Sequence, residues 1–235
     1  MPPSTWLLDP LNGAEHDRDP ACGPRRTYVI ASLPRTGSTL LCRALWDTDQ
    51  AGSPKEYLNP MQVRDWEARL APTRLARRLH RGLRGPLVGM AGRGRWSDAR
   101  LWSYLQRVQR RRTTPNGWFG LKLHWHHHRR WFVAPRREPS TSLGSIRWVL
   151  LTREDRIAQA VSWVRALQTG RWASWQPPAQ RGRYDPHAIA RALRWIQEGE
   201  AGWRRWLQIR GITPLCLSYE DLVEDWAHTL ELVFD

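Results

Sequence analysis

Residues 28–41 run Tyr28-Val29-Ile30-Ala31-Ser32-Leu33-Pro34-Arg35-Thr36-Gly37-Ser38-Thr39-Leu40-Leu41, and this stretch decides the fold of the chain. Its first residues are apolar or β-branched and predict a short buried strand. A proline and a glycine then interrupt the pattern, and apolar residues resume at a spacing that predicts a helix over residues 37–47. A strand, a tight loop and a helix in this order direct backbone N–H groups and the positive end of the helix dipole at an anion.

The loop between this strand and helix carries side chains suited to phosphate or sulfate oxygens. Ser38 and Thr39 add hydroxyl donors at the start of the helix, and Arg35 adds a fixed cation. A plain strand-to-helix turn with an N-capping Ser or Thr is the alternative. The loop is not a Walker A sequence, because no lysine follows Gly37. Enzymes that hydrolyse ATP or GTP, and kinase-like transferases, therefore lose support.

Strand and helix patterns recur along the rest of the chain and predict an α/β fold. Further strands are expected over residues 118–123, 146–151 and 213–217, and further helices over residues 96–112, 157–167 and 184–208. The 235 residues are long enough for one sizeable core. We therefore expect a single α/β domain over residues 27–235, in which a P-loop-like, mainly parallel sheet carries helices on both faces. Residues 1–26 are polar, rich in Pro and Gly, and expected to form a loosely ordered arm.

The loop and two later segments together resemble a known family. Ser-x-Pro-Arg-Thr-Gly-Ser-Thr-Leu-Leu, over residues 32–41, is similar to the phosphosulfate-binding loop of sulfotransferases that use 3′-phosphoadenosine 5′-phosphosulfate (PAPS). Gly52-Ser53-Pro54-Lys55-Glu56-Tyr57 and the stretch Thr113–Trp125 resemble the bacterial trehalose 2-sulfotransferase-like family in particular. The implied reaction moves a sulfuryl group from PAPS to a hydroxyl of a carbohydrate or glycolipid. The resemblance further implies that the loop holds the phosphosulfate through Pro34, Arg35, Thr36, Gly37, Ser38 and Thr39.

A second anion-binding position is expected after the strand at 146–151. Arg153 follows that strand at the end where α/β folds place ligands, although an ion pair with Glu154 or Asp155 is the alternative. PAPS sulfotransferases bind the 3′-phosphate with an Arg after this strand and a Ser on the next helix. The resemblance therefore implies these roles for Arg153 and Ser162. Ser162 lies one residue further along than in the widely shared pattern.

Glu56, Lys122 and His124 are the candidate catalytic residues. Glu56 is the only acid of an irregular connection over residues 51–60. It is either a solvated loop carboxylate or, as the resemblance implies, the general base. Lys122 stands among apolar residues at a strand end, where it could neutralise charge on the transferring sulfuryl group. His124 is expected either to form hydrogen bonds at the acceptor site or to belong to a surface cluster of histidines. His124 and His128 have zinc-ligand spacing on a helix, but no third ligand lies nearby in the sequence, so no metal is expected.

Composition limits the partners and the cellular setting. The chain has 37 Lys and Arg against 22 Asp and Glu, a formal net charge of +15, which favours anionic partners. The run Arg110–Arg112 indicates a solvated face or a nucleic-acid patch. A basic nucleic-acid-binding protein is an alternative function, but no nucleic-acid motif appears, so no specific nucleic acid is expected.

Cysteine usage and hydropathy predict a cytoplasmic protein. Cys22, Cys42 and Cys216 lack metal-ligand spacing and are expected to be reduced thiols. Neither a signal peptide nor a transmembrane segment is expected from the sequence. The resemblance suggests a homodimer. It also suggests a C-terminal truncation, because relatives continue past Asp235, and this keeps open a non-catalytic relative that binds 3′-phosphoadenosine 5′-phosphate (PAP) or sugar.

Overall fold

The computed structural model describes residues 9–18, 23–70, 96–172 and 178–234. The chain divides into two compact units. Unit 1 comprises Met1–Tyr28, Leu45–Leu121 and His127–Ile146, and unit 2 comprises Val29–Ala44, Lys122–His126 and Arg147–Asp235. Cys22 and Asp235 lie outside the described residues.

The described helices and strands follow the predicted alternation. In chain order they are η1 (Pro10–Asn12), η2 (Ala14–His16), β1 (Arg26–Ser32), α1 (Ser38–Asp47), α2 (Pro60–Leu70), α5 (Asp98–Arg112), β2 (Trp118–His124), α6 (Trp125–His128), η3 (Arg129–Val133), α7 (Pro139–Leu143), β3 (Ile146–Thr152), α8 (Arg156–Thr169), α9 (Pro186–Ile209), β4 (Leu215–Ser218), α10 (Tyr219–Glu224) and α11 (Trp226–Phe234).

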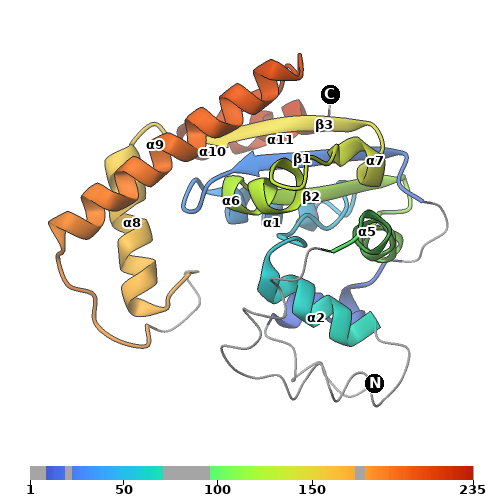
Figure 1. Cartoon of the computed structure of the whole chain (residues 1–235), viewed down its shortest axis with the longest axis horizontal. Coiled ribbons are helices and arrows are strands. Elements are labelled where there is room, and N and C mark those ends of the chain that lie inside the picture. The colour runs from blue at the N-terminus through green and yellow to red at the C-terminus, as the bar shows by residue number, and fades with distance from the viewer. Residues whose placement is uncertain (1–8, 19–22, 71–95, 173–177, 235) are drawn as a thin grey trace. The chain divides into compact units, whose positions relative to one another are not determined.

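The strands form one parallel sheet in the order β2-β1-β3-β4 (Figure 1). Each residue of β2, and each residue of β1 after Arg26, is buried. Such continuous burial is typical of parallel strands that are covered on both faces. The predicted α/β fold with a parallel sheet flanked by helices is therefore confirmed. Between β3 and β4 the register pairs Thr152 with Ser218, the last residue of each strand.

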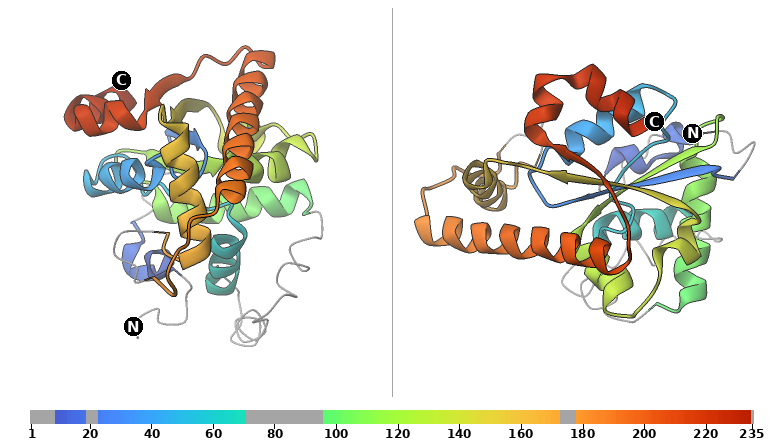
Figure 2. Two further views of the ribbon diagram at one scale, coloured as in Figure 1. Left: turned by 90° about the vertical axis from the view of Figure 1, so that its left-hand side faces the viewer. Right: turned by 90° about the horizontal axis from the view of Figure 1, so that it is seen from above.

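Helices α8 and α9 of unit 2 lie side by side (Figures 1 and 2). The prediction starts the second of these helices at residue 184, whereas α9 starts at Pro186. The side chain of Asp185 accepts a hydrogen bond from the backbone N–H of Ala188, at 2.8 Å, and therefore caps the helix. Proline in the next position is favoured because the first helical residue needs no N–H partner.

Arg112 of unit 1 corrects the expectation for the arginine run. Its side chain is fully buried, with 0% exposed, so this arginine belongs neither to a solvated face nor to a nucleic-acid patch. Its guanidinium donates hydrogen bonds to the backbone oxygens of His16, at 2.6 Å, and Gly13, at 3.0 Å. Such charge-assisted bonds are stronger than neutral ones. They hold residues 9–18, part of the segment expected to be a loosely ordered arm, against α5.

Candidate functional site

The anion loop of unit 2 is locked in a tight turn. Arg35 and Gly37 both have left-handed backbone conformations, with φ of 68° and 75°. A Cβ atom at Gly37 would lie 2.5 Å from Cδ2 of Tyr219, so both the conformation and the available space require glycine. The hydroxyl of Thr36 donates to the carbonyl of Leu33 at 3.0 Å. Helix α1 follows at once, so its first N–H groups lie next to the turn.

Side-chain hydrogen bonds join the loop to α8. Nε of Arg35 donates to Oγ of Ser162 at 2.9 Å, and Nη1 of Arg35 donates to the backbone oxygen of Trp172. The side-chain amide of Gln159 donates to the backbone oxygen of Pro34 at 2.8 Å. The structure therefore brings Ser162 to Arg35, a residue with which the sequence did not pair it.

Arg153 lies beside Tyr219 because of the strand register. Thr152 pairs with Ser218 at the ends of β3 and β4, and Arg153 and Tyr219 are the residues that follow. The Arg153 guanidinium lies 4.5 Å from the centre of the Tyr219 ring, a cation–π arrangement. Within the part of the chain that the structure describes, the buried Nε of Arg153 has no hydrogen-bond partner. A buried donor without a protein partner is unusual, so this N–H group is a candidate for a hydrogen bond to a ligand oxygen.

Arg35 and Arg153 are close enough for their charges to interact. Burial, and then the positive charge of Arg153, lowers the pKa of Arg35. An arginine stays charged at neutral pH despite such a shift, so two cations lie near each other in unit 2. An anion between them would relieve this repulsion and supply acceptors for their N–H groups. The geometry thus fits a ligand with phosphate or sulfate groups.

Lys122 and His124 occupy the end of β2 in unit 2. The buried Lys122 donates from Nζ to the hydroxyl of Thr39 at 3.0 Å, which places its charge at the first turn of α1. Nδ1 of His124 lies 3.1 Å from Oγ of Ser32. Among the described residues, no three His, Cys, Asp or Glu side chains gather as a metal site would require. Unit 2 therefore contains every predicted site residue except Glu56.

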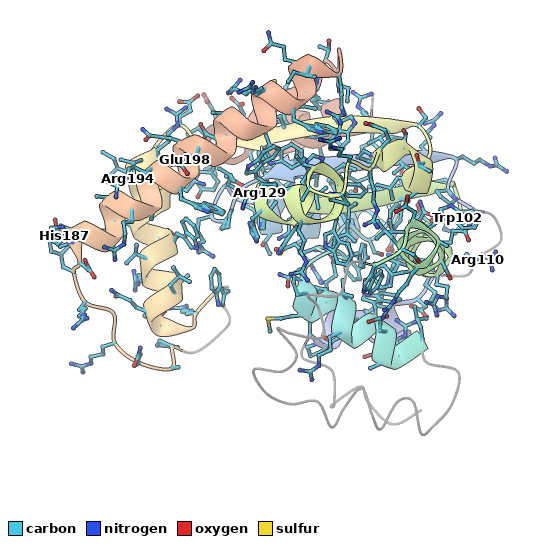
Figure 3. All side chains as sticks on the ribbon, viewed as in Figure 1. Trp102, Arg110, Arg129, His187, Arg194 and Glu198 are labelled. Atoms are coloured by element: carbon cyan, nitrogen blue, oxygen red, sulfur yellow. The ribbon has the colours of Figure 1, made fainter. Side chains whose placement is uncertain are left out.

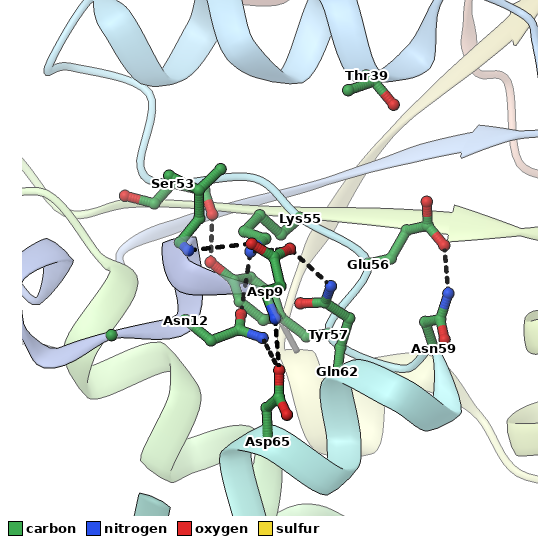
Figure 4. Close-up of polar contacts among 12 residues, drawn as sticks. Asp9, Asn12, Thr39, Ser53, Lys55, Glu56, Tyr57, Asn59, Gln62 and Asp65 are labelled. Atoms are coloured by element: carbon green, nitrogen blue, oxygen red, sulfur yellow. Dashed lines mark hydrogen bonds and ion pairs between the residues drawn. The ribbon is translucent and has the colours of Figure 1, made fainter. Parts of the chain in front are cut away.

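Glu56 belongs to unit 1 and is held by Asn59 (Figure 4). Nδ2 of Asn59 donates to Oε2 of Glu56 at 2.9 Å. Oδ1 of Asn59 accepts from the backbone N–H of Met61 at 3.0 Å, which determines the direction in which the amide faces. Nδ1 of His127 lies 4.0 Å from the same Glu56 oxygen. The carboxylate is 19% exposed and therefore combines a defined orientation with access to solvent.

The lysine next to Glu56 is directed elsewhere. Nζ of Lys55 donates to Oδ2 of Asp9 at 2.7 Å and to Oδ1 of Asn12 at 3.0 Å (Figure 4). This ion pair contributes to the lowered pKa of Asp9, although burial opposes the shift. Asp9 thus supplies a counter-charge for Lys55.

The backbone that carries Glu56 is fastened on both sides of this residue. Gly52 has a φ of 74°, and a Cβ there would lie 2.8 Å from the backbone oxygen of Trp118. The backbone before Glu56 therefore passes through a position that only glycine fits. Further on, Tyr104 donates to the oxygen of Tyr57 at 2.6 Å and Trp131 donates to that of Leu58 at 2.7 Å. The irregular connection is therefore a fixed support for one carboxylate.

Sequence reasoning missed Tyr219, Gln159 and Asn59. Tyr219 and Gln159 contact residues that are distant in the sequence. Asn59 holds Glu56 within a turn that hydrophobic periodicity does not reveal. Ser218 and Asp221, on either side of Tyr219, form a reciprocal capping box at the start of α10. An Asn followed by Pro at a helix start is the one local signal that could have drawn attention to Asn59.

Comparisons with known proteins identify the family of this chain. A family model described as Stf0 sulphotransferase matches residues 27–235, which include every residue of the candidate site. The trehalose 2-sulfotransferase of Mycolicibacterium smegmatis is 32% identical over 228 residues, covering 88% of this chain and 80% of that protein. The trehalose 2-sulfotransferase of Mycobacterium tuberculosis is 29% identical over 231 residues, covering 89% of this chain and 83% of that protein.

Proposed function

The chain belongs to the Stf0 sulphotransferase family, and from this premise we propose that it transfers a sulfuryl group from PAPS to a hydroxyl of a trehalose-like carbohydrate or glycolipid. The observation that supports this donor best is the pair of cations Arg35 and Arg153, with the buried Nε of Arg153 lacking a hydrogen-bond partner in the described residues. Both side chains lie beside the turn that begins α1. This combination suits a ligand with two separate anionic groups.

Each part of the donor is assigned to named residues. The loop from Pro34 to Thr39 holds the 5′-phosphosulfate with backbone N–H groups and hydroxyls. Arg153 and Ser162 hold the 3′-phosphate, with Arg35 between the two anionic groups. When bound, PAPS supplies an activated sulfuryl group and leaves as PAP. Lys122 and the N-terminus of α1 stabilise the negative charge that grows on the leaving phosphate.

Glu56 is the proposed general base. It accepts the proton of the acceptor hydroxyl as the new oxygen–sulfur bond forms and the bond from sulfur to the phosphate oxygen breaks. Asn59 donates to one carboxylate oxygen and so fixes the orientation of the group that receives this proton. His124 is assigned to hydrogen bonding with the acceptor. Fixed cations and donors supply the charge stabilisation, so no metal is part of this proposal.

PAP should bind well and ATP poorly. Arg153 is suited to a 3′-phosphate, which ATP lacks, and the loop has no Walker lysine for a triphosphate. Calorimetric titration of the full chain with PAP, with ATP and with a short DNA duplex measures all three affinities under one condition. Tighter binding of ATP than of PAP would contradict the PAPS proposal, and tight binding of the duplex alone would favour a nucleic-acid-binding protein. PAP binding without sulfate transfer would indicate a non-catalytic relative.

Replacing Arg35 by alanine should weaken PAP binding. The change removes charge-assisted hydrogen bonds, which contribute about 1.5–3 kcal/mol. Lysine at this position should restore binding only in part, because it lacks the planar guanidinium fork. Calorimetry with PAP measures the effect, and Arg205→Gln on the exposed side of α9 is a matched loss of charge. Equal PAP affinity for Arg35→Ala and the parent chain would show that the loop faces another ligand.

The remaining expectations concern the acceptor, the assembly and the location. The two relatives are named for trehalose, which makes trehalose the first acceptor to test. A homodimer and a cytoplasmic location remain predictions. In the described part of the chain, no helix is both long and apolar enough to cross a membrane.

A further inference from the structure

Unit 2 contains a cavity that the proposed roles above do not use. It has a volume of about 690 Å³ and lies between the C-terminal half of α8, the start of α9 and residues 180–185. Small-molecule sites commonly have volumes of about 300–1,000 Å³. The cavity is therefore large enough for a small ligand.

One wall of the cavity is aromatic and apolar. Trp163 of α8 and Trp195 of α9 line it, and their ring centres are 4.3 Å apart with planes tilted by 49°. Val164 and Ala192 continue this wall, and both belong to the buried cluster that joins α8 to α9. Because these side chains are anchored in a packed cluster, the aromatic wall exists before any ligand binds. Large aromatic faces of this kind offer apolar contact area to the C–H face of a sugar ring.

The rim of the cavity is polar, and hydrogen bonds tie part of it to α8. Oε1 of Gln168 accepts a hydrogen bond from the backbone N–H of Arg183 at 2.9 Å. The backbone N–H of Ala179 donates to the oxygen of Thr169 at 2.8 Å. These bonds hold the segment after residue 178 against the end of α8. The rim is therefore positioned by the fold.

The charge of this rim is positive. Among the described residues that line the cavity are three arginines, Arg181, Arg183 and Arg191, and a single acid, Asp185. The Asp185 carboxylate already accepts the backbone N–H of Ala188 as the cap of α9, and this bond is the main reason that its pKa is lowered. Within the described residues, none of the three arginines has a carboxylate within ion-pair distance. The rim thus carries an excess of two positive charges.

The cavity is next to the donor site along α8. Ser162 contacts Arg35 of the anion loop, and the following residue, Trp163, lines the cavity. From these observations we infer that the cavity binds a sugar that carries an anionic group, with the sugar ring on the tryptophans and the anion on the arginines. This inference rests on the proposed function and deepens it, because it adds an anionic group to the trehalose-like sugar that the enzyme would bind.

The test is calorimetry on the full chain saturated with PAP, so that the anion loop is occupied and does not compete for the probe. The probes are trehalose 6-phosphate, trehalose and inorganic phosphate. Trehalose 6-phosphate should bind at least about tenfold more tightly than either of the others, because only it carries both ring and charge. Arg183→Gln and Arg191→Gln should each weaken its binding by about tenfold. Arg194→Gln, on the same helix but outside the cavity lining, should leave it unchanged (Figure 3).

The inference is overturned if trehalose binds as tightly as trehalose 6-phosphate, or if Arg194→Gln weakens the phosphorylated probe as much as the two lining variants do. The three arginine positions are exposed, so these substitutions leave the packed cluster intact. Failure of the proposed function has a different signature. If the parent chain does not bind PAP, the PAPS proposal is wrong, and the three probes titrated without PAP still decide whether the cavity binds an anionic sugar.

Discussion

Replacing Glu56 by glutamine should lower the rate of sulfate transfer by about 10²–10⁴-fold while PAP affinity and the fold stay unchanged. A sugar hydroxyl is a poor nucleophile at neutral pH, and a positioned base contributes this much by removing its proton. Glutamine has nearly the same shape, and its side-chain oxygen can still accept from Asn59. The substitution therefore removes the basicity and keeps the hydrogen bond that holds the side chain.

The measurement is transfer of labelled sulfate from PAPS to an acceptor, with trehalose tried first and PAP affinity measured in parallel. Glu67→Gln is the matched control, because Glu67 is an acid of unit 1 with similar exposure, paired with Arg100. If Glu56 were only a solvated loop carboxylate, its substitution would change neither the transfer rate nor the PAP affinity appreciably. Transfer by Glu56→Gln within a few-fold of the parent rate would remove Glu56 as the base and leave His124 as the next candidate.

Replacing Lys122 by glutamine should lower turnover by about 10²–10³-fold, the usual loss when one fixed electrostatic stabiliser is removed. Lys122 is 5% exposed and donates to Thr39, so its charge is held at the positive end of α1, where an anion is favoured. Glutamine can still donate a hydrogen bond to Thr39, and it lacks the charge. The loss should appear mainly in kcat, because the negative charge on the leaving oxygen develops in the transition state.

The assay is the same sulfate transfer, analysed separately for kcat and KM. Thermal unfolding of Lys122→Gln checks that the buried substitution leaves the fold intact, and Lys122→Arg, which retains the charge, should recover part of the rate. If Lys122→Gln turns over like the parent chain, Lys122 is a structural support for α1 and the assignment of charge stabilisation to it is wrong.

The family and the fold could be predicted from the sequence because their signals are local. The strand, the glycine turn and the helix after it lie within residues 28–47, and each depends on neighbours a few positions away. Capping follows the same rule: Ser218 and Asp221 contact each other because they are three residues apart at a helix start. β3 and α8 were predicted for the same reason to within one or two residues at their ends, and with them the place of Arg153 between them.

Only the tertiary structure decided which side chains meet. Arg35 and Ser162 are 127 residues apart, and they meet because α8 packs beside the anion loop. Tyr219 reaches Arg153 because β3 and β4 are adjacent and in a particular register, and hydrophobic periodicity carries no information on strand order. Arg112 was predicted to be solvated because runs of arginine usually are. In the folded chain, however, residues 11–16 lie against its side chain, and three of their backbone oxygens accept its hydrogen bonds. Local pattern thus determines the elements of this protein, whereas long-range packing determines the partners of its charged groups.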